Sequence, residues 1–267
     1  MNLDEMFDGF WRVYSNLNPD AKKIQNVLCA GREWVNDHIA FRTFNLENFG
    51  ISRLAEPFIS RGYSLKGRYR FQTKRLLACH YEHIDPLIPK IFISELLVEE
   101  FSDFLQETMQ FMIKDVQPPT DLFLTTGRGW RINYKIYSQL LRESEYAAWL
   151  YIFGFVPNHF TIYINSLNNF DSLVEVNQVL KKNGYRVNAN GGEIKGSPAL
   201  GLEQSSTLAY GAEVEFEDLA AIKKIPACYY EFVKRYDSFN GFIAGSADKI
   251  FESTDVNKFP VQEGDFA

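Results

Sequence analysis

A histidine-bearing strand followed by a helix occurs twice in this chain, and the repeat constrains the fold more than any other feature. Residues 37–44 (DHIAFRTF) are rich in β-branched and aromatic residues without glycine or proline, which is typical of a strand. A second strand of this type is expected over 156–164 (VPNHFTIYI). In both places a helix follows and ends at a Gly-Tyr pair, 24 positions after the first histidine and 25 after the second. Self-similarity of this kind predicts two related units in one fold.

Helical and strand-forming segments alternate along most of the chain. Apolar residues at spacings of three and four predict helices, and β-branched or aromatic runs predict strands. The expected helices span 3–17, 20–34, 51–62, 99–113, 134–143, 146–153 and 170–183. Besides the two histidine-bearing strands, strands are expected within 63–83, 90–97, 208–216 and 227–233. Residues 117–120 (QPPT) form the clearest linker, and the Gly- and Ser-rich residues 190–201 are expected to be an inserted loop.

The length of 267 residues suits one large domain or two small, tightly fused ones. Aromatic residues account for 15% of the chain, which favours sheets and a large buried core. We expect a single domain over 1–267 that contains internal units at about 37–116 and 156–236. A helical segment (1–36) precedes these units and a C-terminal segment (237–267) follows them.

Charge and cysteine content limit the partners and the compartment. The net charge of −6 argues against a nucleic-acid partner, because no basic block exists to neutralise phosphates. Apolar runs such as 147–156 are too short to span a bilayer, and the acidic, amphipathic N-terminus is unlike a signal peptide. Cys29, Cys79 and Cys228 show no CxxC spacing and leave one thiol unpaired in any disulfide scheme. We therefore expect a cytoplasmic protein with reduced, structural thiols.

The two histidines on equivalent strands are candidate metal ligands. Side chains alternate along a strand, so His38 shares one face with Arg42, while His159 lies near the start of the second strand. If the units pack as a pair, one added carboxylate completes a 2-His-1-carboxylate set, the usual arrangement in non-haem Fe(II) oxygenases. Glu231 is the first choice, because its neighbours in 228–233 (CYYEFV) are apolar and make an unpaired charge costly. Arg42 would supply a clamp for a metal-bound carboxylate substrate.

The remaining candidates carry weaker signals. Glu95 occupies the repeat-equivalent position of the proposed carboxylate ligand and is a candidate fourth or alternative ligand. Glu213 and Glu215 alternate with apolar residues, which indicates a solvated strand face. His80 and His83 are three apart on an expected strand, point to opposite faces, and are expected to be structural. The sequence has no GxSxG elbow, P-loop or dinucleotide-binding glycine motif, and the glycines within 187–203 suggest a flexible loop or lid.

Three motifs together resemble one enzyme family. Residues 37–44 (DHIAFRTF), 157–161 (PNHFT) and 225–235 (IPACYYEFVKR) resemble the 2-oxoadipate dioxygenase/decarboxylase family, also called hydroxyglutarate synthase. That family is similar to the vicinal oxygen chelate superfamily. The resemblance covers about residues 6–253 and implies an α+β fold. Two paired βαβββ units would form a curved mixed sheet around a metal site, with flanking helices.

The resemblance also implies roles for individual residues. The family's metal ligands correspond to His38, His159 and Glu231, and its substrate arginine corresponds to Arg42. Residues 245–251 (GSADKIF) resemble the family's C-terminal stretch, which implies that Ser246 contacts the substrate carboxylate.

Two departures bear on the substrate more than on the metal site. This chain is shorter than the long bacterial members, and Asp248 and Lys249 replace small residues of the pattern. Both departures concern the length and identity of the substrate.

The implied reaction uses Fe(II) and O2 to convert a 2-oxo dicarboxylic acid, 2-oxoadipate, into 2-hydroxyglutarate and CO2. Two alternatives stay open at this stage. A redox-neutral, glyoxalase-like lyase or isomerase would use Glu95 as a fourth ligand and consume no O2. A non-catalytic protein would bind a small molecule in the same place. Superfamily resemblance does not fix the reaction class, and the sequence leaves the oligomeric state open.

Overall fold

The computed structural model describes residues 1–117, 119–237 and 239–255. Pro118 of the expected linker lies outside this range, as do residues 238 and 256–267 of the expected C-terminal segment. The helices are α1 (Leu3–Leu17), α2 (Asp20–Cys29), α3 (Ile51–Ile59), α4 (Asp103–Ile113), α5 (Tyr134–Glu143), α6 (Glu145–Phe153), α7 (Leu173–Lys182) and α8 (Ala244–Phe251). The strands are β1 (Asn36–Phe44), β2 (Tyr63–Phe71), β3 (Leu76–His83), β4 (Lys90–Leu96), β5 (Pro157–Tyr163), β6 (Lys195–Ser197), β7 (Leu202–Ser206), β8 (Gly211–Phe216), β9 (Leu219–Pro226) and β10 (Tyr229–Arg235).

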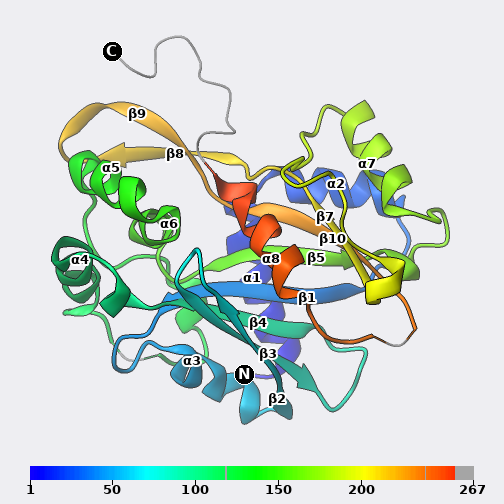
Figure 1. Ribbon diagram of the computed structural model, residues 1–267, viewed down its shortest axis with the longest axis horizontal. Helices are drawn as coiled ribbons and strands as arrows, with labels where there is room; N and C mark the ends of the chain where they lie inside the picture. Colours follow the sequence, from blue (N-terminus) through cyan, green and yellow to red (C-terminus); the bar gives the residue numbers. More distant parts are fainter. Residues whose placement is uncertain (118, 238, 256–267) are drawn as a thin grey trace.

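One large sheet organises the molecule (Figure 1). Its strand order is β2-β3-β4-β1-β5-β10-β7-β6, and β8 and β9 form a separate hairpin sheet. At the centre, β1 and β5 pair antiparallel. Each pairs on its other side, in parallel, with the last strand of its own half: β1 with β4, and β5 with β10. The two halves therefore have matching strand arrangements, and the expected α+β class with paired units in a mixed sheet is confirmed.

The outer face of the sheet carries a large hydrophobic core. Ile39 and Phe41 of β1 point to this face and are fully buried. Phe10 of α1 packs edge-on against Phe41 with ring centroids 5.0 Å apart, and Trp11 packs in the same way against Phe160 of β5. In Figure 1, α1 lies behind the sheet. Apolar burial of this kind stabilises the fold and fixes the register of the central strands, because a slip by one residue would turn every side chain to the other face.

The inner face of the sheet is buried but polar. Its buried polar residues include His38, Arg42, Ser94, His159, Thr161, Gln204, Ser206 and Glu231, and His80 lies on the same face opposite Phe92. Helix α8 crosses in front of this face (Figure 1), and Phe242, just before the helix, packs against the His38 ring at 4.8 Å. Buried polar groups destabilise a fold unless they are paired or bind a ligand, so this face is the place to look for a functional site.

Two expected helix boundaries are wrong for local reasons. The helix expected over 20–34 ends at Cys29, because Ala30 and Gly31 adopt left-handed conformations with φ of 50° and 78°. The helix expected from 99 begins at Asp103, where the Ser102 side chain accepts a hydrogen bond from Leu105 N and caps the helix.

The expected strands also change in the second half. The loop expected over 190–201 contains the short strand β6, which pairs with β7, a strand that the sequence did not predict. The strand expected from 208 begins at Gly211 as β8, and its hairpin partner β9 was missed. Because β6 and β7 extend the large sheet, the segment 187–203 is partly an integral sheet element; its proposed role as a lid stays a prediction.

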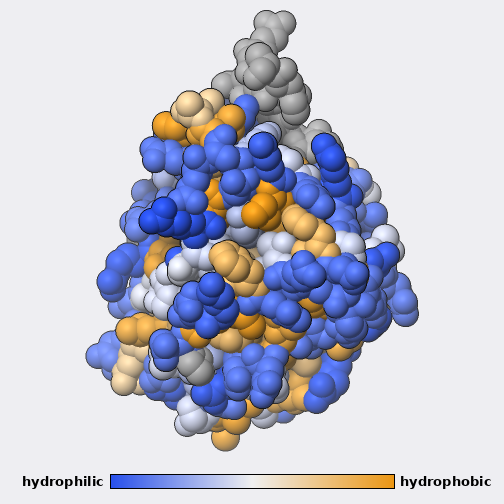
Figure 2. Space-filling view, turned by 90° about the vertical axis from the view of Figure 1, so that its left-hand side faces the viewer, coloured by the Kyte–Doolittle hydropathy of each residue, from blue (hydrophilic) through white to orange (hydrophobic). Residues whose placement is uncertain are grey.

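The visible surface is mostly hydrophilic, which agrees with a composition of 46% hydrophobic and 23% charged residues. On the face shown in Figure 2, hydrophilic residues predominate and hydrophobic residues appear as smaller patches between them. Among the described residues, we find no helix with the length and apolar character that a membrane span requires.

Candidate metal centre

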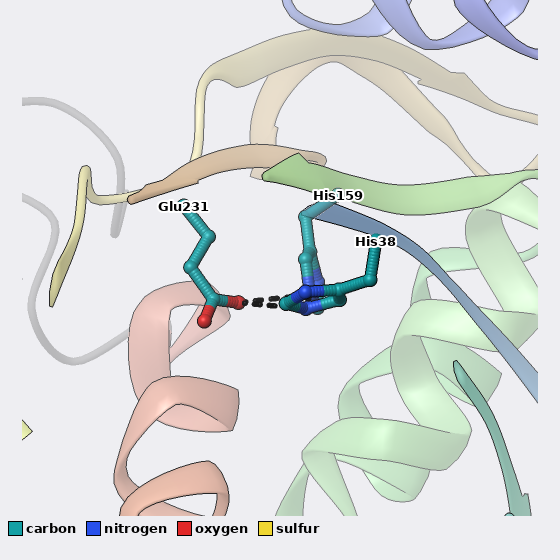
Figure 3. Close-up of side chains that lie close together, drawn as sticks. All are labelled: His38, His159 and Glu231. Carbon is teal, nitrogen blue, oxygen red and sulfur yellow. Dashed lines mark hydrogen bonds and ion pairs between the residues drawn. The ribbon is translucent and has the colours of Figure 1, made fainter. Parts of the chain in front are cut away.

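His38, His159 and Glu231 lie on three adjacent strands of the inner face. Ala40 of β1 is opposite His159 of β5, which in turn is opposite Tyr229 of β10. With the alternation of side chains, this register turns the two histidines and the glutamate to the same side. Figure 3 shows the three side chains pointing toward one another. The structure therefore brings together the three residues that the sequence singled out as metal ligands.

The distances within this triad suit a metal ion. Glu231 Oε2 is 3.0 Å from His159 Nε2 and 3.5 Å from His38 Nε2, and the two Nε2 atoms are 3.4 Å apart. One ligand atom from each residue lies within 4.8 Å of the others, and all three residues are buried. Imidazole nitrogens and a carboxylate oxygen bind first-row ions at about 2.0–2.2 Å, so this separation accommodates one ion between them. Two histidines and one carboxylate fit Fe(II) and leave coordination positions for substrates.

The second ring nitrogen of each histidine is held by the residue that precedes it. His38 Nδ1 lies 2.9 Å from Asp37 Oδ1, and His159 Nδ1 lies 3.0 Å from Asn158 Oδ1. Arg235 binds the Asp37 carboxylate through Nε and Nη2 at 2.6 and 2.8 Å. These contacts orient both imidazoles with Nε2 toward the site, as outer partners do in metal centres. Sequence reasoning missed them, although an Asp or Asn directly before each histidine was the available signal.

Electrostatic coupling within the triad favours a bound cation. Burial raises the pKa of Glu231, but His38 and His159 outweigh this effect and lower it to about 2. Burial lowers the pKa of His159 to about 4, with Glu231 opposing the shift. Burial also acts to lower the pKa of His38, but Glu231 and Asp37 raise it above its ordinary value. A buried, ionised carboxylate of this kind requires a positive partner. A protonated His38 is one such partner, and a divalent metal ion that displaces this proton is another.

Gln204 of β7 fixes the orientation of the candidate carboxylate ligand. Its Nε2 donates a hydrogen bond to Glu231 Oε1 at 2.7 Å, so that the other oxygen, Oε2, faces the two imidazoles. Gln204 is buried. Sequence reasoning missed this residue, because strand β7 was not predicted.

We expect Gln204→Met to weaken iron binding about 10-fold while the protein stays folded. Methionine has a similar shape but cannot donate the hydrogen bond, and loss of an outer partner typically costs 10- to 100-fold in metal affinity. Anaerobic titration with Fe(II) measures the effect. The matched control is Ser205→Ala, which removes a buried hydroxyl from the opposite face of the same strand. Equal iron affinities of both variants would contradict the orienting role.

Arg42 is buried on the same face, next to the start of α6. Its Nη2 donates to Thr254 Oγ1 at 2.9 Å, and its Nη1 lies 3.5 Å from Glu145 Oε1. The rings of Tyr146 and Trp149 each lie 4.9 Å from its Cζ atom. Its Nε has no hydrogen-bond partner among the described residues. The guanidinium is therefore held in a fixed plane by aromatic rings, with its Nε donor available.

Ser246 and Glu95 occupy different surroundings. Ser246 is buried on α8 and lies close to Gly196 of β6. Its Oγ is 3.4 Å from the position that a Cβ atom would occupy if residue 196 were not a glycine. Glu95 is paired with Thr43 on the outer-face side of β4, and its Oε2 accepts a hydrogen bond from Ile51 N at 2.7 Å. The structure thus uses Glu95 to cap the start of α3 and does not bring it to the triad.

The other histidines and the paired acidic residues are not part of the triad. His80 is buried and contacts the Tyr69 hydroxyl and Glu82 at 2.8 and 3.2 Å, whereas His83 Nδ1 accepts from Asp85 N. Glu213 and Glu215 are exposed on β8. All four serve local structure or solvent contact, as expected from their spacing.

Comparison with known proteins decides the family. The sequence profile of the 2-oxoadipate dioxygenase/decarboxylase family matches residues 11–126 and 120–236. The chain belongs to this family. A 2-oxoadipate dioxygenase/decarboxylase of Oryza sativa subsp. japonica is 36% identical over 91% of this chain and 76% of its own length.

Solved structures give the same result for this dioxygenase/decarboxylase family member. Hydroxyglutarate synthase from Oryza sativa, in complex with 2-oxoadipate, is 34% identical, with a TM-score of 0.87 over 95% of this chain and 92% of that chain. A Shewanella frigidimarina protein, provisionally described as a hydrolase, is 44% identical, with a TM-score of 0.86 over 91% and 98%. A glyoxalase superfamily protein from Ralstonia eutropha shares the fold at 22% identity, with a TM-score of 0.72 over 90% and 84%.

Proposed function

We propose that this protein is an Fe(II)-dependent dioxygenase/decarboxylase that converts 2-oxoadipate and O2 into 2-hydroxyglutarate and CO2. The observation that carries the proposal is the triad of His38, His159 and Glu231, buried on the inner face with the Arg42 guanidinium nearby. Membership of the 2-oxoadipate dioxygenase/decarboxylase family and the 2-oxoadipate complex of the rice relative support the substrate.

The triad would hold the Fe(II) ion, and neighbouring residues would orient the ligand side chains. When bound, Fe(II) supplies the site for the 2-oxo acid group and the electrons for reaction with O2. Three protein ligands leave the remaining positions to these two substrates. Asp37 and Asn158 keep both imidazoles in the tautomer that presents Nε2.

Arg42 would orient the substrate by binding the carboxylate that is not at the metal. An extended dicarboxylic acid bound at the metal through its 2-oxo acid group has a second carboxylate, and Arg42 offers an unused Nε donor on the same face. Holding this carboxylate fixes which carbon of the substrate faces the metal. Phe242 and Phe251 pack over the same face, against the His38 and Phe92 rings, and keep water out. Ser246, as the family resemblance implies, would add a contact to a substrate carboxylate.

Oxygen consumption by anaerobically Fe(II)-loaded protein, with and without 2-oxoadipate, tests the proposal directly. We expect uptake that requires both iron and the oxo acid, together with formation of 2-hydroxyglutarate. No uptake with 2-oxoadipate or with shorter and longer 2-oxo acids would overturn it. Binding of Zn or Ni with turnover but no oxygen uptake would instead favour the glyoxalase-like reaction, and ligand stabilisation without turnover would favour a binding protein.

We expect Glu95→Ala to leave metal affinity unchanged and to destabilise the fold by about 1 kcal/mol, because it removes only the cap on Ile51 N. Metal titration and urea unfolding of the same variant measure both effects. The four-ligand, redox-neutral alternative makes the opposite prediction, a large loss of metal affinity. This variant therefore separates the two metalloenzyme reactions without an activity assay.

A further inference from the structure

Two buried polar groups on the inner face have donors without a partner in the part of the chain that the structure describes. One is Nε of Arg42, and the other is the phenol hydroxyl of Tyr229. Tyr229 lies on β10 directly opposite His159, it is fully buried, and it is not among the residues that the sequence singled out. A buried donor without an acceptor costs about 1–3 kcal/mol, so two of them beside a candidate metal centre point to a ligand that accepts from both.

The ring of Tyr229 is held firmly in place. It stacks on the imidazole of His159, with centroids 4.5 Å apart and an interplanar angle of 23°. Ala209 and Ile250 pack on it, and its backbone carbonyl accepts a hydrogen bond from the Tyr14 hydroxyl at 2.7 Å. The hydroxyl therefore has a fixed position, which is what a substrate-positioning group requires.

The charged groups near the hydroxyl include both a metal-ligand candidate and the proposed anion clamp. Tyr229 interacts electrostatically with the Glu231 carboxylate and with the Arg42 guanidinium. A protonated phenol beside a guanidinium is suited to an anionic acceptor, and a substrate carboxylate is such an acceptor.

We propose that Tyr229 is a substrate-positioning residue, whose hydroxyl donates a hydrogen bond to the same substrate carboxylate that Arg42 binds. This inference rests on the proposed function and deepens it. Tyr229 and Arg42 lie on β10 and β1, with β5 and its His159 between them. The two donors would select 2-oxo acids that carry a second carboxylate over those that end in a methyl group.

Binding of two substrates to two variants tests the inference. Tyr229→Phe keeps the stacked ring and removes only the hydroxyl. Tyr230→Phe is the matched control. Tyr230 is the next residue, is equally buried, and its hydroxyl also has no partner among the residues described, but its ring packs against Trp11 and Tyr14 on the outer face. The ligands are 2-oxoadipate and 2-oxohexanoate, which has the same chain length without the second carboxylate. Their dissociation constants are measured anaerobically by calorimetry on Fe(II)-loaded protein.

We expect Tyr229→Phe to weaken 2-oxoadipate binding about 10-fold or more, the usual worth of a hydrogen bond to a charged group, and to leave 2-oxohexanoate unchanged. Tyr230→Phe should match the wild type with both ligands. Wild-type affinity of Tyr229→Phe for 2-oxoadipate, or equal weakening of both ligands, would overturn the inference while the proposed function stands. Failure of the wild type to bind 2-oxoadipate would instead overturn the proposed function itself. Thermal unfolding of both variants checks that they are folded.

Discussion

Glu231→Gln is expected to abolish tight Fe(II) binding, with a loss of more than about 100-fold in affinity, and to abolish iron-dependent oxygen uptake. Glutamine keeps the shape of the side chain but removes the single negative charge among the three candidate ligands. Separating a buried charge from its partner costs about 3–5 kcal/mol, which corresponds to this loss. His38→Ala and His159→Ala should have effects of the same kind, because each removes one of the two imidazole ligands.

Anaerobic Fe(II) titration followed by oxygen-uptake assays measures this effect. The matched control is Glu215→Gln, which makes the same change on the exposed face of β8 and should leave both readouts at the wild-type level. Circular dichroism establishes that the variants fold. Wild-type iron affinity in a folded Glu231→Gln protein would refute the assignment of this ligand.

Arg42→Lys should lower kcat/KM for 2-oxoadipate about 100-fold and leave the iron in place. Lysine carries the same charge but lacks the planar fork, so it cannot satisfy Thr254 and a substrate carboxylate together, and it cannot stack between Tyr146 and Trp149 in the same way. Loss of a hydrogen bond between two charged groups, worth about 1.5–3 kcal/mol, accounts for an effect of this size. The metal ligands lie on other residues, so iron affinity should not change.

Steady-state kinetics and metal analysis on the same preparation separate the two readouts. Arg68→Lys is the control, because Arg68 is exposed on β2 at the edge of the sheet. Full kcat/KM in Arg42→Lys would show that Arg42 has only a structural role. Loss of iron together with activity would show that its effect passes through the metal centre.

The ligand triad was accessible from the sequence because each member breaks a local pattern. His38 and His159 recur at matching places in two strand–helix units, and Glu231 is a charge in an apolar strand. The alternation of side chains then gives the face that each occupies. The convergence of these three residues therefore follows from local rules and one assumption, that the units pair.

The supporting residues were not accessible in this way, because their roles depend on contacts between distant segments. Gln204 reaches Glu231 only because β7 pairs with β10, and Arg235 reaches Asp37 across 198 positions of the sequence. Tyr229 differs from Tyr230 only in the face to which it points, which a run of aromatic residues does not reveal. Glu95 was misjudged because the repeat argument compares positions along the chain, whereas the register of β4 against β1 decides the face.

The candidate ligands come from both sides of the β1–β5 contact at the centre of the sheet. His38 belongs to the half formed by β2, β3, β4 and β1, whereas His159 and Glu231 belong to the half formed by β5, β10, β7 and β6. Neither half carries a complete set, so a bound ion would cross-link them. The metal affinity would then depend on how the two halves are positioned relative to each other. Substitutions along the β1–β5 contact would change the metal affinity without altering a ligand side chain.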